Sequence, residues 1–338
     1  MPQLVAGGFV GVDVFFVLSG FLITGLIARQ EGEGQFCLKR FYLARLMRLV
    51  PALATMLAGI LAIAWWLLLP HEVQELRHGM AHSLADFLRF TVSPKAGYFQ
   101  GAIEDKPLVH LWSLAVEGQF YLLWPLVLVA VPERRRLIAA VALIIAASFT
   151  ANLAMVGDVL ARAYYLPQSR VWQLALGGLL ALAIAREQGK QHLARGLDRF
   201  GIARARAASG ASAVGLVLIG VAALTFTDGL EYPGWWALVP TLGALLVIGA
   251  GPEAVPNRAF LASQPMVAMG LVSYALYLWH WPLIAFRNIL DLEEDTWVTA
   301  ICLAAALALA AATYRFIEQP LRTLRLPSRL ASRRSSLR

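Results

Sequence analysis

Four polar residues recur at helical spacing within an otherwise apolar segment, PLVHLWSLAVEGQFYLLWPLVL. They are His110, Ser113, Glu117 and Tyr121, at offsets of 0, 3, 7 and 11, so a helix places them on one face. An ionisable group inside a lipid bilayer costs on the order of a few kcal/mol and is expected to serve a function. Four polar groups in register favour a chemical site here. The alternative is a Glu that pairs with an Arg to lock two helices.

A second polar stripe lies in SYALYLWHWP, where Ser273, Tyr277 and His280 stand at offsets of 0, 4 and 7. The unperturbed pKa of histidine, about 6.5, suits His280 to acid–base chemistry near neutral pH. Pro282 is expected to break or kink the helix that carries the stripe. The flanking tryptophans support another interpretation, an aromatic belt that anchors the segment at the membrane interface.

Two arginines, Arg45 and Arg48, stand three residues apart in FYLARLMRLVPAL, at the start of an apolar segment. Two guanidinium groups on one helical face suit the bidentate recognition of phosphates. Lys39 and Arg40, just before them, are better explained as cations whose stems lie along the membrane surface while their charges reach water.

One acid, Asp13, lies within the apolar run of GGFVGVDVFFVLSGFLITGLIARQ. It is expected to pair with a cation of an upstream helix that is absent from this chain, or to line the path of an acceptor substrate. The alternative is a carboxylate that complements the dipole at a helix N-terminus. The glycines of GGFVGV would allow a second helix to approach closely in either case.

The composition places these residues in a membrane protein. Hydrophobic residues make up 59% of the chain and charged residues 15%, against about 25% charged in a typical soluble domain. The fold class predicted is therefore all-α and polytopic. The two cysteines, Cys37 and Cys302, lie in unrelated contexts, which argues against a disulfide framework or a cysteine metal site.

Apolar windows long enough to cross a bilayer predict about nine transmembrane helices. The segment 70–110 does not fit a span, and it is predicted to form an amphipathic helix over Val73–Phe90 and an irregular loop, outside the membrane or re-entrant. The nine windows are 8–28, 48–69, 111–131, 137–157, 169–185, 209–226, 235–250, 268–287 and 297–315.

Alternating these spans places 22 of the 29 Lys and Arg residues on one side of the membrane. By the positive-inside rule, that side is the cytoplasm, so the C-terminus is predicted inside and Met1 outside. An N-terminus that must cross the membrane without a preceding targeting segment is unusual. We therefore expect an upstream span to be absent from this chain. Residues 323–338 are predicted to be a disordered, basic cytoplasmic tail attracted to anionic lipid.

Six ordered blocks of the sequence resemble the acyltransferase family 3 membrane proteins. The resemblance runs from Gly7 to about Arg322 and implies a ten-helix core, of which this chain lacks the first helix. It further implies transfer of an acyl group, usually acetyl, from cytoplasmic acyl-CoA to a hydroxyl of a cell-envelope glycan. The blocks are GGFVGVDVFFVLSGFLI, FYLARLMRLVPAL, KPLVHLWSLAVEGQFYLLWP, YYLPQSRVWQLALGGLLAL, SYALYLWHWPL and YRFIEQPLR.

The resemblance also assigns roles to residues. It implies that Arg45 and Arg48 hold the CoA phosphates, and that a catalytic His lies on the absent first helix, where Glu117 would orient it. Gln173 stands where the family pattern commonly has Glu. The catalytic candidates are Glu117, Ser113 and His280, and the substrate-binding candidates are Asp13, His110, Trp112, Gln119, Tyr121 and Arg170.

The predicted organisation is a membrane acyltransferase domain over residues 1–322 in the inner (plasma) membrane. The expected partners are membrane lipid and an envelope glycan or lipid-linked saccharide, with no nucleic acid, no metal and any extracytoplasmic partner domain on a separate chain. Three other interpretations stay open. They are a glycan transporter or flippase, a homologue that has lost activity with the first helix, and a haem protein ligated by His110 and His280.

Overall fold

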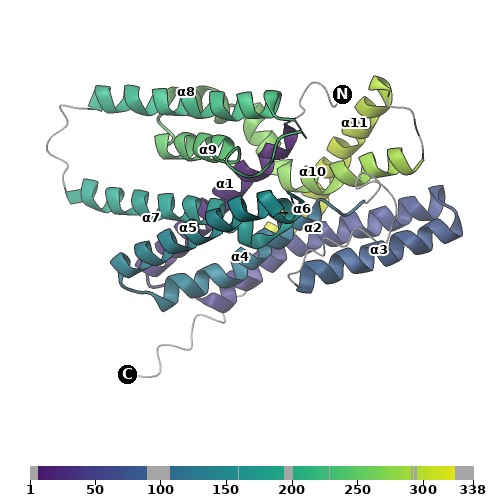
Figure 1. Cartoon of the computed structure of the whole chain (residues 1–338), viewed down its shortest axis with the longest axis horizontal. Helices are drawn as coiled ribbons and strands as arrows, with labels where there is room; N and C mark the ends of the chain where they lie inside the picture. The colour runs from purple at the N-terminus through teal and green to yellow at the C-terminus, as the bar shows by residue number, and fades with distance from the viewer. Residues whose placement is uncertain are drawn as a thin grey trace. The chain divides into compact units, whose positions relative to one another are not determined.

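A computed structural model of the 338-residue chain describes residues 7–89, 107–158, 160–193, 201–227, 229–290, 292 and 295–323. The described residues are helical, with no strand among them. Two compact units divide them (Figure 1). The first unit contains α1 and α4 to α9, and the second contains α2, the first part of α3 and nearly all of α10 to α12.

Twelve α-helices account for most of the described chain (Figure 1). Short 3₁₀ or π turns, at Gly8–Val10, Pro167–Ser169, Asn257–Leu261 and Tyr314–Glu318, adjoin several of them. The helices are α1 (Gly11–Gly32), α2 (Leu38–Leu67), α3 (Pro70–Arg89), α4 (Leu111–Ala130), α5 (Arg134–Asp158), α6 (Leu160–Tyr165), α7 (Val171–Leu193), α8 (Gly201–Thr225), α9 (Leu238–Ala250), α10 (Gln264–Ile289), α11 (Thr296–Thr313) and α12 (Gln319–Thr323).

Each of the nine predicted spans coincides with an apolar helix, which confirms a polytopic, all-α membrane protein. Seven of the described helical segments are long and apolar enough to cross a bilayer, and two, Val171–Ala185 and Leu238–Ala250, are shorter apolar stretches. The second span differs most from its prediction, because α2 begins at Leu38 rather than near residue 48. Both Arg45 and Arg48 therefore lie inside a helix and not in a loop before it.

The first unit is organised around a close crossing of α1 and α7. Gly20 of α1 and Gly177 of α7 make this crossing possible. A Cβ atom at Gly20 would lie 1.8 Å from the carbonyl oxygen of Leu174, and one at Gly177 would lie 2.0 Å from that of Val17. Small residues at such a contact let two helix backbones touch in the absence of a hydrophobic driving force between lipid-exposed helices.

The glycines near the start of the chain contribute less to helix packing than the sequence suggested. Gly7 does approach another helix, because its Cβ would meet the carbonyl oxygen of Ala222 in α8 at 2.2 Å. Gly8 and Gly11 have open space where a side chain would go. Gly215 and Gly243 pack α8 against α9, which run side by side (Figure 1).

The second unit holds α10 through tryptophan and tyrosine contacts. The indole N–H of Trp279 donates to Thr313 Oγ1 at 2.9 Å, and its ring occupies the space that a Cβ at Gly59 would need. The phenol of Tyr274 donates to the carbonyl oxygen of Leu49 at 2.9 Å. Helix α10 continues through Pro282 to Ile289, so the helix does not break at that proline.

Helix α3, Pro70–Arg89, confirms the helix predicted after residue 70. The predicted irregular loop lies largely outside the described residues, since it falls on 90–106. The predicted basic tail lies outside them as well, except for residue 323.

Candidate functional site

The polar stripe of α4 is buried in the first unit. His110 immediately precedes the helix, and Ser113, Glu117 and Tyr121 follow on it, all four with less than a tenth of their surface exposed. Gln119, on the same helix, is half-buried. An amphipathic surface helix would expose its polar face to water. Here the polar face is buried inside the unit, which both the functional interpretation and the alternative of a Glu that locks two helices require.

Glu117 is the centre of a cluster of hydroxyl groups, which we call the Glu117 cluster and define as Ser19, Glu117 and Tyr121. The Ser19 hydroxyl and the Tyr121 phenol both donate to Oε1 of Glu117. The Tyr121 oxygen also lies 3.5 Å from Ser19 Oγ. Tyr121 comes one helical turn after Glu117 on α4, whereas Ser19 comes from α1 and is brought in by the folding of the unit.

Ser19 is a residue that sequence reasoning missed. A serine inside the apolar run of the first span was the available signal, but nothing in the spacing of that span paired it with α4. Its neighbour Gly20 sets the close contact of α1 with α7. The same short stretch of α1 therefore supplies both a helix contact and a donor to Glu117.

Asp13 lies in a second group, the Asp13 cluster, defined as Asp13, Arg170, Gln173 and Tyr232. Arg170 Nη1 donates to Asp13 Oδ1 at 2.9 Å, with both side chains about 1% exposed. Gln173 Nε2 donates to the same oxygen, and the Tyr232 phenol donates to Oδ2. The cation beside Asp13 is thus Arg170 of this chain, and the acid beside Arg170 is Asp13.

An aromatic cage surrounds the Arg170 guanidinium. Its carbon lies 4.8 Å from the ring centre of Tyr164 and 5.6 Å from those of Trp112 and Tyr232. Its Nε also donates to the Tyr164 carbonyl oxygen at 3.0 Å. Cations over aromatic faces gain stabilisation when they are desolvated. Trp112, a substrate-binding candidate, is therefore one wall of the cage around another candidate, Arg170.

The Tyr232 phenol belongs to the loop between α8 and α9, outside the spans. Its burial, reinforced by the negative charge of Asp13, raises the pKa of Tyr232 well above its usual value. The phenol therefore keeps its proton at physiological pH and donates a hydrogen bond to the carboxylate. This donor ties the loop to the first turn of α1, where Asp13 lies.

The remaining candidates lie in the second unit. Arg45 is half-buried, with its guanidinium carbon 5.7 Å from the centre of the Phe41 ring, and Arg48 is exposed one turn later on α2. Nδ1 of the half-buried His280 lies 2.6 Å from the Tyr277 carbonyl oxygen. A carbonyl oxygen only accepts, so Nδ1 carries the proton in this contact, and Nε2 holds the lone pair of the neutral ring.

Comparison with known proteins relates this chain to one family. The model of an acyltransferase domain, acyltransferase family 3, matches residues 2–315. A protein of Komagataeibacter xylinus provisionally named membrane-bound transacylase BcsY is 32% identical over 93% of this chain and 76% of its own length. No solved structure shows a significant match.

Two further relatives are longer proteins. One, of Bacillus subtilis, is provisionally named peptidoglycan O-acetyltransferase YrhL and is 29% identical over 94% of this chain. The other, O-acetyltransferase OatA of Staphylococcus aureus, is 32% identical over 95% of this chain. The chain spans about half the length of each, 51% and 53%. The family model covers nearly the whole sequence, and the chain therefore belongs to the acyltransferase 3 family, as a multi-pass membrane acyltransferase.

Proposed function

We propose that this acyltransferase moves an acetyl group from cytoplasmic acetyl-CoA to a hydroxyl of a cell-envelope glycan in the inner membrane, with the C-terminus inside the cell. The observation that carries the proposal is the Glu117 cluster, a buried carboxylate that accepts hydrogen bonds from two hydroxyl groups. The names of two relatives, both O-acetyltransferases, support acetyl transfer to oxygen.

The reaction needs little from the protein beyond positioning and proton transfer, because a thioester is already activated. The glycan oxygen attacks the thioester carbonyl, a C–O bond forms, the C–S bond breaks, and the CoA thiolate takes up a proton. In the proposal, Glu117 receives the proton from the glycan hydroxyl, and the Ser113 hydroxyl steadies the developing oxyanion. General bases contribute about 10²–10⁴ in rate, and donors to an oxyanion contribute a comparable amount.

His280 is proposed as a second acid–base group. With its Nδ1 proton directed at the Tyr277 carbonyl, Nε2 is the basic nitrogen of the neutral ring. The substrate-binding roles proposed for Gln119 and Tyr121 follow from their place on the helix that carries Glu117, and the role proposed for His110 follows from its place directly before that helix. Arg170 contacts both Asp13 and Trp112. We propose that these three residues support substrate binding indirectly, by holding α1, α4 and α7 in place.

Arg45 and Arg48 are proposed to bind the phosphates of CoA. They lie one turn apart in α2, on the side of the membrane predicted to be cytoplasmic. Exposed Arg48 is accessible to a soluble donor, and half-buried Arg45 is steadied by the Phe41 ring. Guanidinium groups bind phosphates bidentately, which a lysine cannot do.

Transfer of radiolabelled acetyl from acetyl-CoA to glycan, by the full chain reconstituted in liposomes, tests the proposal. Glu117→Gln is expected to lower transfer by at least about 100-fold while acetyl-CoA still binds. Replacement of both Arg45 and Arg48 by Ala is expected to abolish donor binding. The matched control replaces Lys39 and Arg40, two exposed cations on the first turn of the same helix, and should leave binding intact. Wild-type protein that moves glycan across the bilayer without labelling it would identify a flippase instead.

A further inference from the structure

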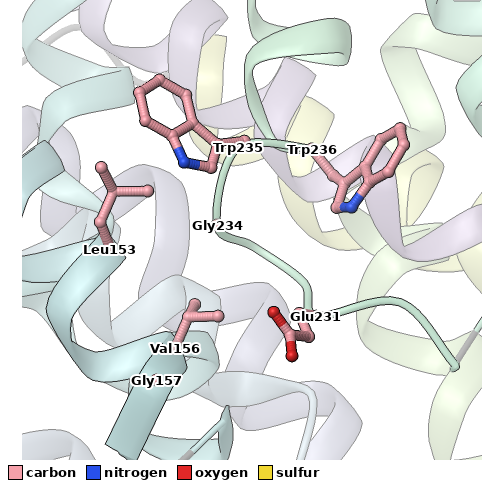
Figure 2. Close-up of a pocket in the computed structure, with 7 residues that line it drawn as sticks. All are labelled: Leu153, Val156, Gly157, Glu231, Gly234, Trp235 and Trp236. Carbon is pink, nitrogen blue, oxygen red and sulfur yellow. The ribbon is translucent and has the colours of Figure 1, made fainter.

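An aromatic pocket in the first unit has no role in the reaction described so far. It has a volume of about 230 Å³ and lies between the C-terminal part of α5 and the loop before α9 (Figure 2). Helix α5 contributes the apolar side chains of Leu153 and Val156. The loop contributes Glu231, Trp235 and Trp236, and the figure shows the Glu231 carboxylate on the same side of the loop as the two α5 residues.

The loop that forms this pocket is held in one conformation. Buried Asn152 of α5 donates from Nδ2 to the Gly234 carbonyl oxygen at 3.0 Å. Gly234 has a φ of +38°, and a Cβ there would lie 2.8 Å from the Glu231 carbonyl oxygen, so the turn requires glycine. The Phe149 ring packs edge-on against Trp235, with ring centres 5.3 Å apart. The Tyr232 hydrogen bond to Asp13 fixes the loop from its other side.

The rings that this loop presents lie exposed on the surface of the chain, at the beginning of the span predicted over 235–250. Trp235 is 66% exposed and Trp236 45% exposed, and Glu231 is exposed as well. An indole offers a flat, electron-rich face and one N–H donor, and a carboxylate offers acceptors. A sugar ring has the complementary groups, since one of its faces carries C–H bonds and its rim carries hydroxyl groups. The volume lies below the roughly 300–1,000 Å³ of pockets for drug-sized ligands, which limits the occupant to about one sugar ring.

Exposed tryptophans also occur at membrane interfaces, where they anchor a protein in the headgroup layer. Three features of this pair favour a ligand. Anchoring needs no cavity, it needs no glycine-dependent turn pinned by a buried asparagine, and a carboxylate in the same loop would repel anionic headgroups. The chain offers a contrast in Trp66 of α2, which is 86% exposed and does not line this pocket.

We propose that the pocket of Trp235, Trp236 and Glu231 binds one sugar ring of the glycan acceptor, outside the membrane. The outer placement follows from the positive-inside topology, in which the loop between α8 and α9 faces away from the cytoplasm. The inference rests on the proposed function for the identity of the glycan as acceptor. The pocket is a docking subsite, and its side chains take no part in proton transfer.

Binding without a donor tests the subsite independently of catalysis. Calorimetric titration of the detergent-solubilised full chain would use two probes, soluble glycan strands from peptidoglycan and a neutral exopolysaccharide. Trp235→Ala is expected to weaken binding on the order of tenfold, as removal of an aromatic stacking platform does. Trp235→Phe should retain most of the affinity, Glu231→Gln should weaken it less than Trp235→Ala, and Trp66→Ala should leave it unchanged.

Transfer assays separate this proposal from the proposed function. Trp235→Ala is expected to raise KM for the glycan about tenfold and to leave kcat and acetyl-CoA binding unchanged. A wild-type chain that binds glycan through Trp235 but transfers no acetyl group would refute the proposed function alone. Transfer with an unaltered glycan KM in Trp235→Ala would refute the subsite alone. The subsite is also refuted if the wild type binds neither probe, or if Trp66→Ala weakens binding as much as Trp235→Ala.

Discussion

Asp13 and Glu117 are two buried carboxylates in one compact unit, and α1 contributes to the surroundings of both, yet their hydrogen-bond donors differ in kind. Asp13 accepts hydrogen bonds from a guanidinium, an amide and a phenol, and the guanidinium neutralises the carboxylate charge. Glu117 accepts hydrogen bonds from the hydroxyls of Ser19 and Tyr121. A guanidinium does not release its proton at physiological pH, whereas a hydroxyl can donate and accept. The contrast assigns structural support to the Asp13 cluster and proton chemistry to the Glu117 cluster.

Removal of Arg170 is the strongest test of this contrast. Arg170→Ala leaves the Asp13 charge buried without its counterion, which costs about 3–5 kcal/mol for a buried pair. We expect a large fall in the melting temperature, measured by thermal unfolding of the detergent-solubilised protein. Glu117→Gln keeps the shape of its side chain and should change the melting temperature little, although it should lower transfer by at least about 100-fold.

A double variant, Asp13→Asn with Arg170→Gln, is the control for this prediction. It removes both charges and keeps polar groups in place, so it should unfold at a higher temperature than Arg170→Ala. Equal loss of stability in the two variants would mean that the ion pair itself contributes little. Equal destabilisation by Arg170→Ala and Glu117→Gln would remove the distinction between the clusters.

The helix contact that supports both clusters gives the next largest effect. Gly20→Ala would place a Cβ 1.8 Å from the Leu174 carbonyl oxygen, so α1 and α7 must separate. Overpacking costs about 1–3 kcal/mol, and the shift should lower both the melting temperature and acetyl transfer. Gly25→Ala, on the same helix, meets no atom within 4 Å and should be neutral or slightly stabilising. An active, fully stable Gly20→Ala protein would show that the crossing is not needed to hold the two clusters.

Sequence periodicity predicted much of this fold, because bilayer thickness imposes a length on apolar segments that is easy to count. The spacing of Ser113, Glu117 and Tyr121 likewise predicted a shared face on α4. The partners were harder to predict, since pairing between helices far apart in the chain depends on tertiary contacts. Arg170 was predicted to bind substrate, and the structure pairs it with Asp13.

Other features had no periodic signal at all. Ser19 and Tyr232 come from a span and a loop whose patterns predict only an apolar helix and a turn, although both donate to buried carboxylates. Of the two outcomes predicted at Pro282, a break or a kink, the break does not occur, because α10 continues past it; prolines are tolerated within membrane helices. The pocket beside Trp235 depends on the approach of a loop to α5, which a sequence pattern does not reveal.

A matched pair of tyrosines gives the most discriminating test. Tyr232→Phe removes one donor to Asp13 and should cost about 1.5–3 kcal/mol of stability, the usual contribution of a hydrogen bond to a charged group. Tyr121→Phe removes one donor to Glu117, where the Ser19 hydroxyl remains on the same oxygen. It should lower acetyl transfer about tenfold, a fall equivalent to about 1.4 kcal/mol at the transition state, with a smaller loss of melting temperature.

Alkaline pH sharpens the comparison, because burial and the Asp13 charge raise the pKa of Tyr232 in the folded protein. The stabilising contribution of a group whose pKa is raised by folding is complete below its unfolded pKa, about 10 for tyrosine. Above that pH the unfolded tyrosine ionises while the buried one does not, so the contribution declines. The melting-temperature gap between wild type and Tyr232→Phe should therefore be constant from pH 7 to 9 and shrink above pH 10. A gap that widens instead would mean that Tyr232 ionises more readily in the folded protein, and its place as a protonated donor to Asp13 would be wrong.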